Sequence, residues 1–258
     1  GNVVDPDRMI ATYGADTVRL YEMFVAPPEK ELEWTDTGLE GSFRFLTRVW
    51  RLVTTLCGVV SGVPPNGLGT MTLDDDHRAL RRKTHDSIRR VSTDLDPRAH
   101  LNTAVSALME LVNELYAFSE RHGLAPHTVA AGQRTPAARV PVQTRAVLAE
   151  AIDALVLMLS PFTPHLCEEL WEQLGHVGGL TRVPWPTCDT DVARADEIVV
   201  PVQVNGKLRA RLRVAADVSE DVLRAAALAQ PVVLTHIAGR TVARVVIVQR
   251  KLVNIVVR

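Results

Sequence analysis

Residues 146–175, which read AVLAEAIDALVLMLSPFTPHLCEELWEQLG, constrain the fold more than any other part of this sequence. Apolar residues recur there at helical spacing on both sides of Ser160–Pro161. Proline lacks an N–H group but fits the first turn of a helix, so one helix should end at Ser160–Pro161 and the next should begin near Pro164. The segment therefore predicts two consecutive helices that form the central hairpin of a helical bundle.

Composition excludes several classes of protein. The chain has 258 residues, enough for one large or two moderate domains, and 47% of them are hydrophobic. No apolar run reaches the roughly 20 residues of a membrane helix, and no signal peptide is visible because Val3 and Val4 are followed at once by Asp5. The three cysteines are scattered without a CxxC pair, so neither a disulfide framework nor a zinc ribbon is indicated. We expect a cytoplasmic protein with no membrane partner.

The charge is distributed unevenly along the chain. Residues 196–258 carry ten Lys or Arg and five Asp or Glu, a net charge of +5, whereas residues 1–195 carry nineteen and 25, a net charge of −6. A basic tail on a mildly acidic body favours an anionic partner for the tail.

Capping residues and apolar spacing predict further helices ahead of the hairpin. In the first long helix, capped by Asp36 or Thr37, the positions expected to face the core include Phe43 and Trp50. Asp74–Asp76 should open the second, and Asp96–Pro97 should start the third. The predicted segments are two short helices within 5–26 and long helices over about 38–60, 74–93 and 97–123.

Two of these helices carry rows of cations. Arg44, Arg48 and Arg51 share one face of the first long helix, because they follow the i, i+4, i+7 spacing. Such a row is either a solvated face or a set of phosphate contacts, and the forked guanidinium suits the second use. The same two alternatives apply to the second long helix, which carries Arg78, Arg81, Arg82, Lys83, Arg89 and Arg90.

The hydrophobic period changes from about 3.6 to 2 after residue 196, which indicates strands. Asn205–Gly206 is a strong hairpin signal. On the second strand Leu208, Ala210, Leu212 and Val214 alternate with Lys207, Arg209, Arg211 and Arg213, so we expect one apolar and one cationic face. A two-residue loop would place the valines of the first strand on the cationic face. We therefore predict an odd-length loop or a bulge.

The rest of the tail predicts two helices and two strands. Ser219 should cap a helix through Gln230, and Pro231 should start a second that ends at Gly239. Strands over 241–249 and 251–257 follow, with Val242, Val246 and Val248 on one face. The predicted fold class is mainly α, an antiparallel helical bundle followed by a small α+β domain of order ββ-αα-ββ. The predicted domains are 1–35, 36–190 and 191–258.

Several segments resemble class I aminoacyl-tRNA synthetases for aliphatic amino acids. GNVVDPD…YGADTVRLYEMF resembles the segment after the KMSKS loop, and LSPFTPHLCEELW resembles the anticodon-binding bundle of class Ia. GSFRFLTRVWRLV and VPVQVNGKLRARLRV…IAGRTVARVVIVQRKLVNIVVR resemble the bacterial leucyl-tRNA synthetase family, whereas the zinc-binding cysteines of isoleucyl enzymes and the coiled coil of valyl enzymes are missing. One departure is QRKLVNIVVR, where the family often has a Pro–Gly–Lys turn.

The resemblance implies a role in docking leucine tRNA. The parent enzyme of that family attaches leucine to its tRNA with ATP and Mg²⁺, in catalytic and editing domains of the same chain. The HIGH and KMSKS motifs are not in this sequence, so we expect it to have no catalytic residue, cofactor or metal and to be inactive alone. Residues 1–35 would then be a connector after the KMSKS loop. The bundle at 36–190 would lie along the tRNA without reading the anticodon, and the tail would contact the elbow of the tRNA.

The candidate tRNA-binding residues are the cations of the first long helix, of the basic strand and of the last two strands. A monomer is expected. The alternatives are a non-catalytic module that binds RNA or protein, or the equivalent part of another aliphatic-specific synthetase. The candidates are Arg44, Arg48, Arg51, Lys207, Arg209, Arg211, Arg213, Arg240, Arg244 and Lys251.

Overall fold

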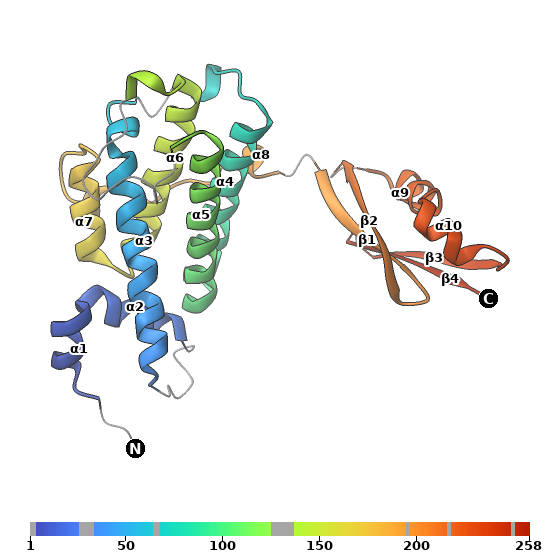
Figure 1. Cartoon of the computed structure of the whole chain (residues 1–258), viewed down its shortest axis with the longest axis horizontal. Coiled ribbons are helices and arrows are strands. Elements are labelled where there is room, and N and C mark those ends of the chain that lie inside the picture. The colour runs from blue at the N-terminus through green and yellow to red at the C-terminus, as the bar shows by residue number, and fades with distance from the viewer. Residues whose placement is uncertain are drawn as a thin grey trace. The chain divides into compact units, whose positions relative to one another are not determined.

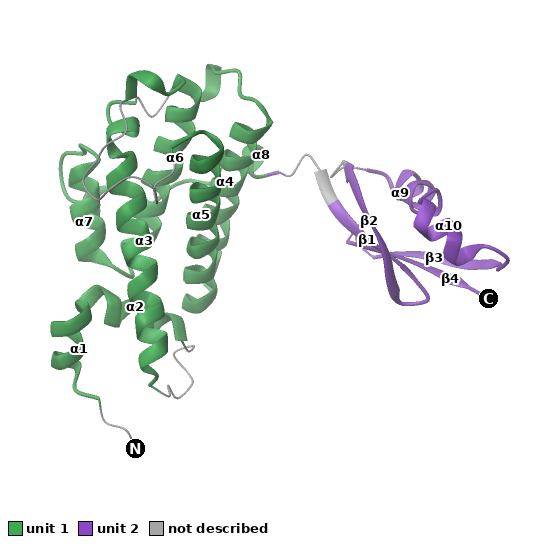
Figure 2. Cartoon of the chain, in the orientation of Figure 1, with its two compact units in different colours: residues 1–193 green, residues 194–258 purple. Residues whose placement is uncertain are grey.

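A computed structural model describes residues 4–25, 34–63, 68–124, 137–194, 197–215, 218–248 and 251–258. The chain divides into two compact units, residues 1–193 and 194–258, each described here by itself (Figure 2). Residues 27–33, whose sequence predicts a polar link to Trp34, and most of residues 124–140, whose sequence predicts a loop, lie outside the described ranges. Among the helices within those ranges, none has both the length and the apolar character needed to cross a membrane.

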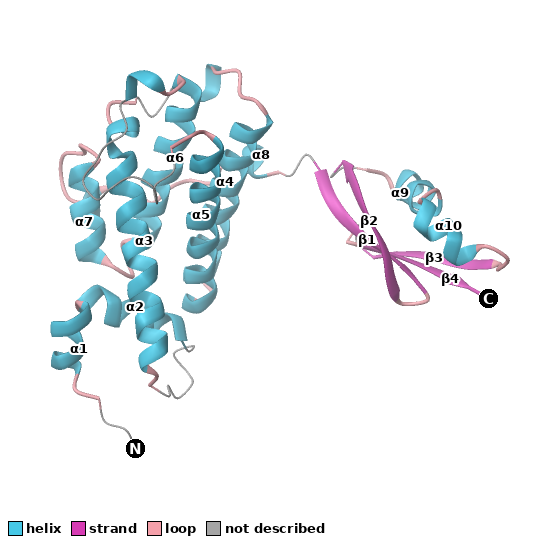
Figure 3. Ribbon diagram, in the orientation of Figure 1, coloured by secondary structure: helices cyan, strands magenta, loops and turns pink. Residues whose placement is uncertain are grey.

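The first unit is built of helices (Figures 1 and 3). A pair of helices comes first, the five helices of the bundle follow, and a single turn ends the unit. Their bounds are α1 Pro6–Tyr13, α2 Ala15–Val25, α3 Asp36–Val60, α4 Asp75–Leu95, α5 Leu101–Arg121, α6 Val142–Leu159, α7 Pro164–Gln173 and α8 Thr190–Ala193.

The central hairpin is confirmed. α6 ends at Leu159, and Pro164 occupies the first turn of α7. Ser160, Pro161 and Phe162 turn the chain, and Phe162 is 1% exposed. The proline therefore sets the break between the two helices, and the short turn stays attached to the core through a buried aromatic ring.

Two predicted helix starts are wrong in detail. α3 follows Thr35, which makes no side-chain cap hydrogen bond, while Asp36 is already helical and accepts a hydrogen bond from Trp34 Nε1 at 3.1 Å. α5 begins at Leu101 rather than directly after Pro97. By contrast Asp74 does cap α4, because its carboxylate accepts from the His77 N–H at 2.9 Å.

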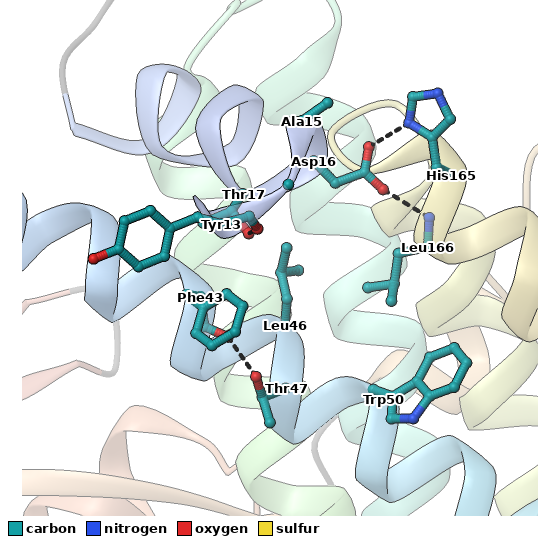
Figure 4. Close-up of a pocket in the computed structure, with 11 residues that line it drawn as sticks. Tyr13, Ala15, Asp16, Thr17, Phe43, Leu46, Thr47, Trp50, His165 and Leu166 are labelled. Atoms are coloured by element: carbon teal, nitrogen blue, oxygen red, sulfur yellow. Dashed lines mark hydrogen bonds and ion pairs between the residues drawn. The ribbon is translucent and has the colours of Figure 1, made fainter. Parts of the chain in front are cut away.

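The core of the bundle joins α3 to α7. It contains Leu52 and Leu56 from α3, Leu108 and Leu111 from α5, and Leu155 from α6, each fully buried. Phe43 and Trp50, which we expected to face this core, are instead 43% and 37% exposed. They lie on a second apolar stripe of α3 that faces outward beside α2 and α7 (Figure 4).

The segment after α7 returns along α4. Trp185 Nε1 donates to Ser92 Oγ at 2.8 Å, and the Asp189 N–H donates to His85 Nδ1 at 3.1 Å. α8 then packs against α4. The chain thus reaches the boundary at residue 193 from a fixed position on the bundle.

The second unit is a four-stranded sheet with two helices on one face (Figures 1 and 3). Its order in the chain is ββ-αα-ββ, as predicted. In the sheet the order is β2-β1-β4-β3, with β1 and β4 parallel and both outer pairs antiparallel. The bounds are β1 Glu197–Val204, β2 Lys207–Ala215, α9 Glu220–Leu228, α10 Pro231–Ile237, β3 Val242–Val248 and β4 Leu252–Val257.

The helices cover the face of the sheet that carries alternate valines and isoleucines of the two central strands. Leu223 of α9 and Val233 of α10 pack on Val202 and Ile255 there, all fully buried. The Ser219 hydroxyl caps α9 by accepting from the Val222 N–H at 3.3 Å, as predicted. This unit therefore has one helix-covered face and one face without helices.

The β1–β2 hairpin contains the predicted bulge but not an odd-length loop. Asn205 and Gly206 form a two-residue turn with φ angles of 48° and 78°. Val204 pairs with Lys207 and Val202 pairs with Ala210, so the register shifts by one residue at Arg209. The extra residue restores apolar partners to the valines.

The strand faces near the bulges differ from our expectation. Leu208 pairs with Gln203 on the helix-free face and is 49% exposed rather than buried. In β3 a second register shift lies between Val242 and Arg244, so Val242 does not share a face with Val246 and Val248. Each shift reverses the alternation on one side of it, which strict period-two reading misses.

Candidate nucleic-acid interface

The three arginines of α3 are all exposed but differ in how they are held. Arg44 lies 3.6 Å from Glu40, its neighbour one turn earlier. Arg48 donates to Asn113 Oδ1 of α5 at 2.9 Å and lies 5.0 Å above the Tyr116 ring. The Arg51 side chain has no hydrogen-bonding or ionic partner in the described part of the chain, although its carbonyl oxygen accepts from the Thr54 hydroxyl at 3.4 Å. This row of arginines on α3 therefore presents three cations, one of which is oriented by α5.

Three of the cations of α4 are paired with carboxylates of neighbouring helices. Glu110 of α5 accepts from Lys83 and Arg90, both at 2.6 Å, and these hydrogen bonds, that from Arg90 foremost, lower the pKa of Glu110 from 4.5 to about 2. Arg81 forms a two-bond pair with Glu150 of α6 at 2.8 and 2.9 Å. These cations join helices, which favours the interpretation of α4 as a structural charge row.

The tail cations do not form the single face that the sequence predicts. Because the bulge at Arg209 reverses the alternation, Arg211 and Arg213 pair opposite Pro201 and Val199 on the helix-free face. Both arginines are exposed. The β3 bulge places Arg244 on the same face, opposite Val256, and it is exposed too.

Lys207 and Arg209 lie instead on the helix-covered side. Together with Arg240 they line a cavity of about 400 Å³ between the hairpin and the end of α10. Lys251 is exposed in the turn between β3 and β4 and lines no part of this cavity. The candidate tail residues therefore fall into three sets. One set lines this cavity, the second comprises the three arginines on the helix-free face and is called the helix-free-face group, and Lys251 in the turn stands alone.

A second cavity, of about 490 Å³, lies where α2, α3 and α7 meet (Figure 4). Phe43 and Trp50 of α3 and Tyr13 at the end of α1 line it, with Leu166 of α7. Asp16 accepts from the Leu166 N–H at 2.7 Å beside this cavity. Helical spacing did not predict this cavity, because Phe43 and Trp50 fit the apolar pattern of core positions.

No metal centre is evident in the part of the chain that the structure describes. Within it, no three side chains of His, Cys, Asp or Glu come together in a way that could hold a metal ion. The arrangement that remains is a set of cations at three places, most of them exposed. Its chemistry is the binding of anions.

Comparisons with known proteins give consistent matches. The family described as the anticodon-binding domain of tRNA ligase matches residues 77–224. The leucine–tRNA ligases of Syntrophobacter fumaroxidans and Geotalea daltonii are 45% and 44% identical over 257 residues, which is 100% of this chain. The chain spans 29% of the length of each of these relatives.

The likeness to a solved structure also covers the chain in full. That structure is the ternary complex of Agrobacterium radiobacter K84 LeuRS with tRNA and LeuAMS, which is 29% identical with a TM-score of 0.76. The match covers 100% of this chain and 30% of the other. The likeness therefore extends over the bundle and over the small sheet unit.

Proposed function

Because this chain belongs to the family of anticodon-binding domains of tRNA ligases, we propose that it is the tRNA-docking part of a leucine–tRNA ligase. One observation carries the proposal. The similarity to leucine–tRNA ligases extends over the entire chain, including the basic sheet unit that follows the bundle. A bundle alone is shared by several synthetases, whereas the basic hairpin after it resembles the leucyl family.

Docking in this proposal is electrostatic and geometric. Arg44, Arg48 and Arg51 contact the phosphate backbone along the bundle, and the tail cations contact the elbow of leucine tRNA. Arginine suits both contacts because its planar fork donates two hydrogen bonds to one phosphate. The paired cations of α4 stay outside this interface, since Glu110 and Glu150 already accept their hydrogen bonds and offset most of their charge. Neither contact reads a base edge, so specificity rests on the shape of the RNA.

The chemistry of leucine activation belongs to other parts of the enzyme in this proposal. The relatives are more than three times as long as the matched region, and the segments outside it would supply the catalytic and editing domains. ATP and Mg²⁺ would bind in those segments. Residues 1–35 would connect the bundle to that catalytic part. The protein would act as a monomer in the cytoplasm.

An interaction module that binds another RNA or a protein is the competing class. It is less well supported, because every relative reported above over the whole chain is a leucine–tRNA ligase. The equivalent part of another aliphatic-specific synthetase is disfavoured for the same reason.

Filter binding of the 258-residue chain to leucine tRNA over a salt series tests the proposal. With about five phosphate contacts, affinity should fall roughly 10²- to 10³-fold between about 50 and about 200 mM salt. A blunt-ended RNA duplex of similar length is the control, and it should bind more weakly because it lacks the elbow. Absent binding, or binding that salt does not change, would contradict the docking function.

A further inference from the structure

The cavity between the hairpin and the end of α10, which we call the Arg209 cavity, is assembled from two layers of the sheet unit. Val204, Asn205, Lys207 and Arg209 come from the hairpin. The other lining residues, Thr235, His236, Ala238 and Arg240, come from the last turn of α10 and the residues after it. Its volume of about 400 Å³ accommodates a phosphate group with part of an attached sugar.

The lining of the Arg209 cavity is cationic and includes no carboxylate. Three of its residues, Lys207, Arg209 and Arg240, are cations, and a hydroxyl, an imidazole and an amide supply further polar groups. This contrasts with α4, where Arg81, Lys83 and Arg90 each have a glutamate. Cations gathered around a cavity without a carboxylate leave an anion as the group that completes it.

Arg209 supplies a second, independent observation. Its Nε is buried and has no hydrogen-bond acceptor in the described part of the chain. Leaving a buried charged donor unpaired is costly, so an acceptor from a ligand would satisfy it. Arg209 is also the extra residue of the bulge, between the pairs Gln203–Leu208 and Val202–Ala210. The bulge is what turns its side chain toward α10, since strict alternation would place it with Arg211.

The hairpin wall of the cavity is held in place before any ligand arrives. The Asn205 N–H donates to the Ile255 carbonyl at 2.9 Å, and the Gly206 N–H donates to Asn254 Oδ1 at 3.1 Å. These bonds fasten the turn to β4, so Lys207 and Arg209 start from a fixed backbone. Such preorganisation reduces the ordering cost of binding.

We propose that the Arg209 cavity is the binding site of a single backbone phosphate of RNA, which Arg209, Lys207 and Arg240 hold. The inference rests on the proposed function, which supplies the RNA, and it separates these three cations from the helix-free-face group. Arg209 donates through its fork to the phosphate oxygens, and Lys207 and Arg240 neutralise the charge. A purely structural role is the rival account, in which the cations only offset the carbonyl groups that end α10.

Phosphate-ethylation interference on leucine tRNA, measured with the full chain, tests this phosphate-binding site. The unchanged protein should show interference at a set of phosphates. Arg209→Gln, Lys207→Gln and Arg240→Gln should each lose interference at the same phosphate and retain the others. Binding should weaken about tenfold or more for Arg209→Gln, and the salt slope should fall by about 1. Arg209→Lys keeps the charge but not the fork, so it should only partly restore affinity.

Arg258→Gln is the charge-matched control in the same unit, since Arg258 is exposed and does not line the cavity. It should retain the interference at the phosphate that binds in the Arg209 cavity. The three variants could lose interference at different phosphates, or Arg209→Gln could leave the interference pattern unchanged. Either result would overturn the phosphate-binding site while leaving tRNA docking intact. A lower melting temperature with an unchanged pattern would assign Arg209 to the end of α10 and would also overturn it. Absence of tRNA binding by the unchanged protein would overturn both proposals.

Discussion

The side chain of Asn205 is bonded to the backbone of Val257 through both of its polar groups. Asn205 Nδ2 donates to the Val257 carbonyl oxygen at 3.1 Å, and the Val257 N–H donates to Asn205 Oδ1 at 2.9 Å. The turn of the first hairpin is thereby fastened to the last strand, 52 residues later in the chain. This bond pair replaces part of the ladder where β1 and β4 run parallel.

Asn205→Ala should destabilise the sheet unit. The change removes two hydrogen bonds, worth about 1 kcal/mol each. It also places alanine at a φ of 48°, which costs about 1 kcal/mol more. We expect the free energy of opening of β4, measured by amide hydrogen exchange, to fall by about 2–3 kcal/mol. Asn205→Asp keeps the acceptor, so its free energy of opening should fall by about half as much. Equal exchange rates in all three proteins would contradict a stabilising role for the Asn205 side-chain hydrogen bonds.

Asp16→Ala should destabilise the bundle. The Asp16 side chain is 11% exposed and accepts from the Leu166 N–H at 2.7 Å and from His165 Nδ1 at 2.9 Å, so α2 caps the start of α7 (Figure 4). Removing the carboxylate leaves a partly buried N–H unsatisfied, at a cost of about 1–3 kcal/mol in urea unfolding. The control is Glu172→Ala on the exposed side of α7, which should change stability by less than about 0.5 kcal/mol. Similar losses in both variants would show that Asp16 does not act as a cap.

Glu110 should contribute stability that depends on pH. Hydrogen bonds from Arg90 and Lys83 lower its pKa from 4.5 to about 2 in the folded chain. A lowered folded-state pKa means that the contribution is fully present above about pH 4.5 and is lost as the pH falls toward 2. Because the side chain is 48% exposed, solvent screening limits the contribution to about 1 kcal/mol.

Urea unfolding of Glu110→Gln beside the unchanged protein measures this contribution. The variant should be less stable at pH 7, and the gap should narrow at pH 3 as the glutamate of the unchanged protein begins to take up a proton. A gap of the same size at both pH values would contradict the proposed ion pairs with Lys83 and Arg90.

Local signals were sufficient for much of the fold. The break between α6 and α7 depends on prolines and on apolar spacing that a sequence displays directly. The bulge could be anticipated from the period-two alternation of the two strands, because the valines of β1 needed apolar partners on β2. Its place at Arg209 could not be predicted, since it depends on how the hairpin meets α10 and β4.

The candidate site depended more on tertiary contacts. A helical wheel shows that Phe43 and Trp50 form an apolar stripe, but not that α2 and α7 leave this stripe open. It also shows six cations on α4, but not that Glu110 and Glu150 pair with three of them from α5 and α6. The sequence therefore identified the cations, whereas their pairing and their division by the bulge required the three-dimensional arrangement.

Arg51→Gln should weaken the binding of leucine tRNA more than Arg89→Gln. Both side chains are exposed cations on the bundle, but Arg89 is paired with Asp86 one turn earlier, and Arg51 has no such partner among the described residues. A phosphate contact by Arg51 should disappear with the charge, so the salt slope of binding should fall by about 1. Arg89→Gln should leave the slope unchanged, because its charge is already offset by the carboxylate. If both substitutions lower the slope equally, the bundle contributes only a diffuse field, and the row on α3 is not a set of phosphate contacts.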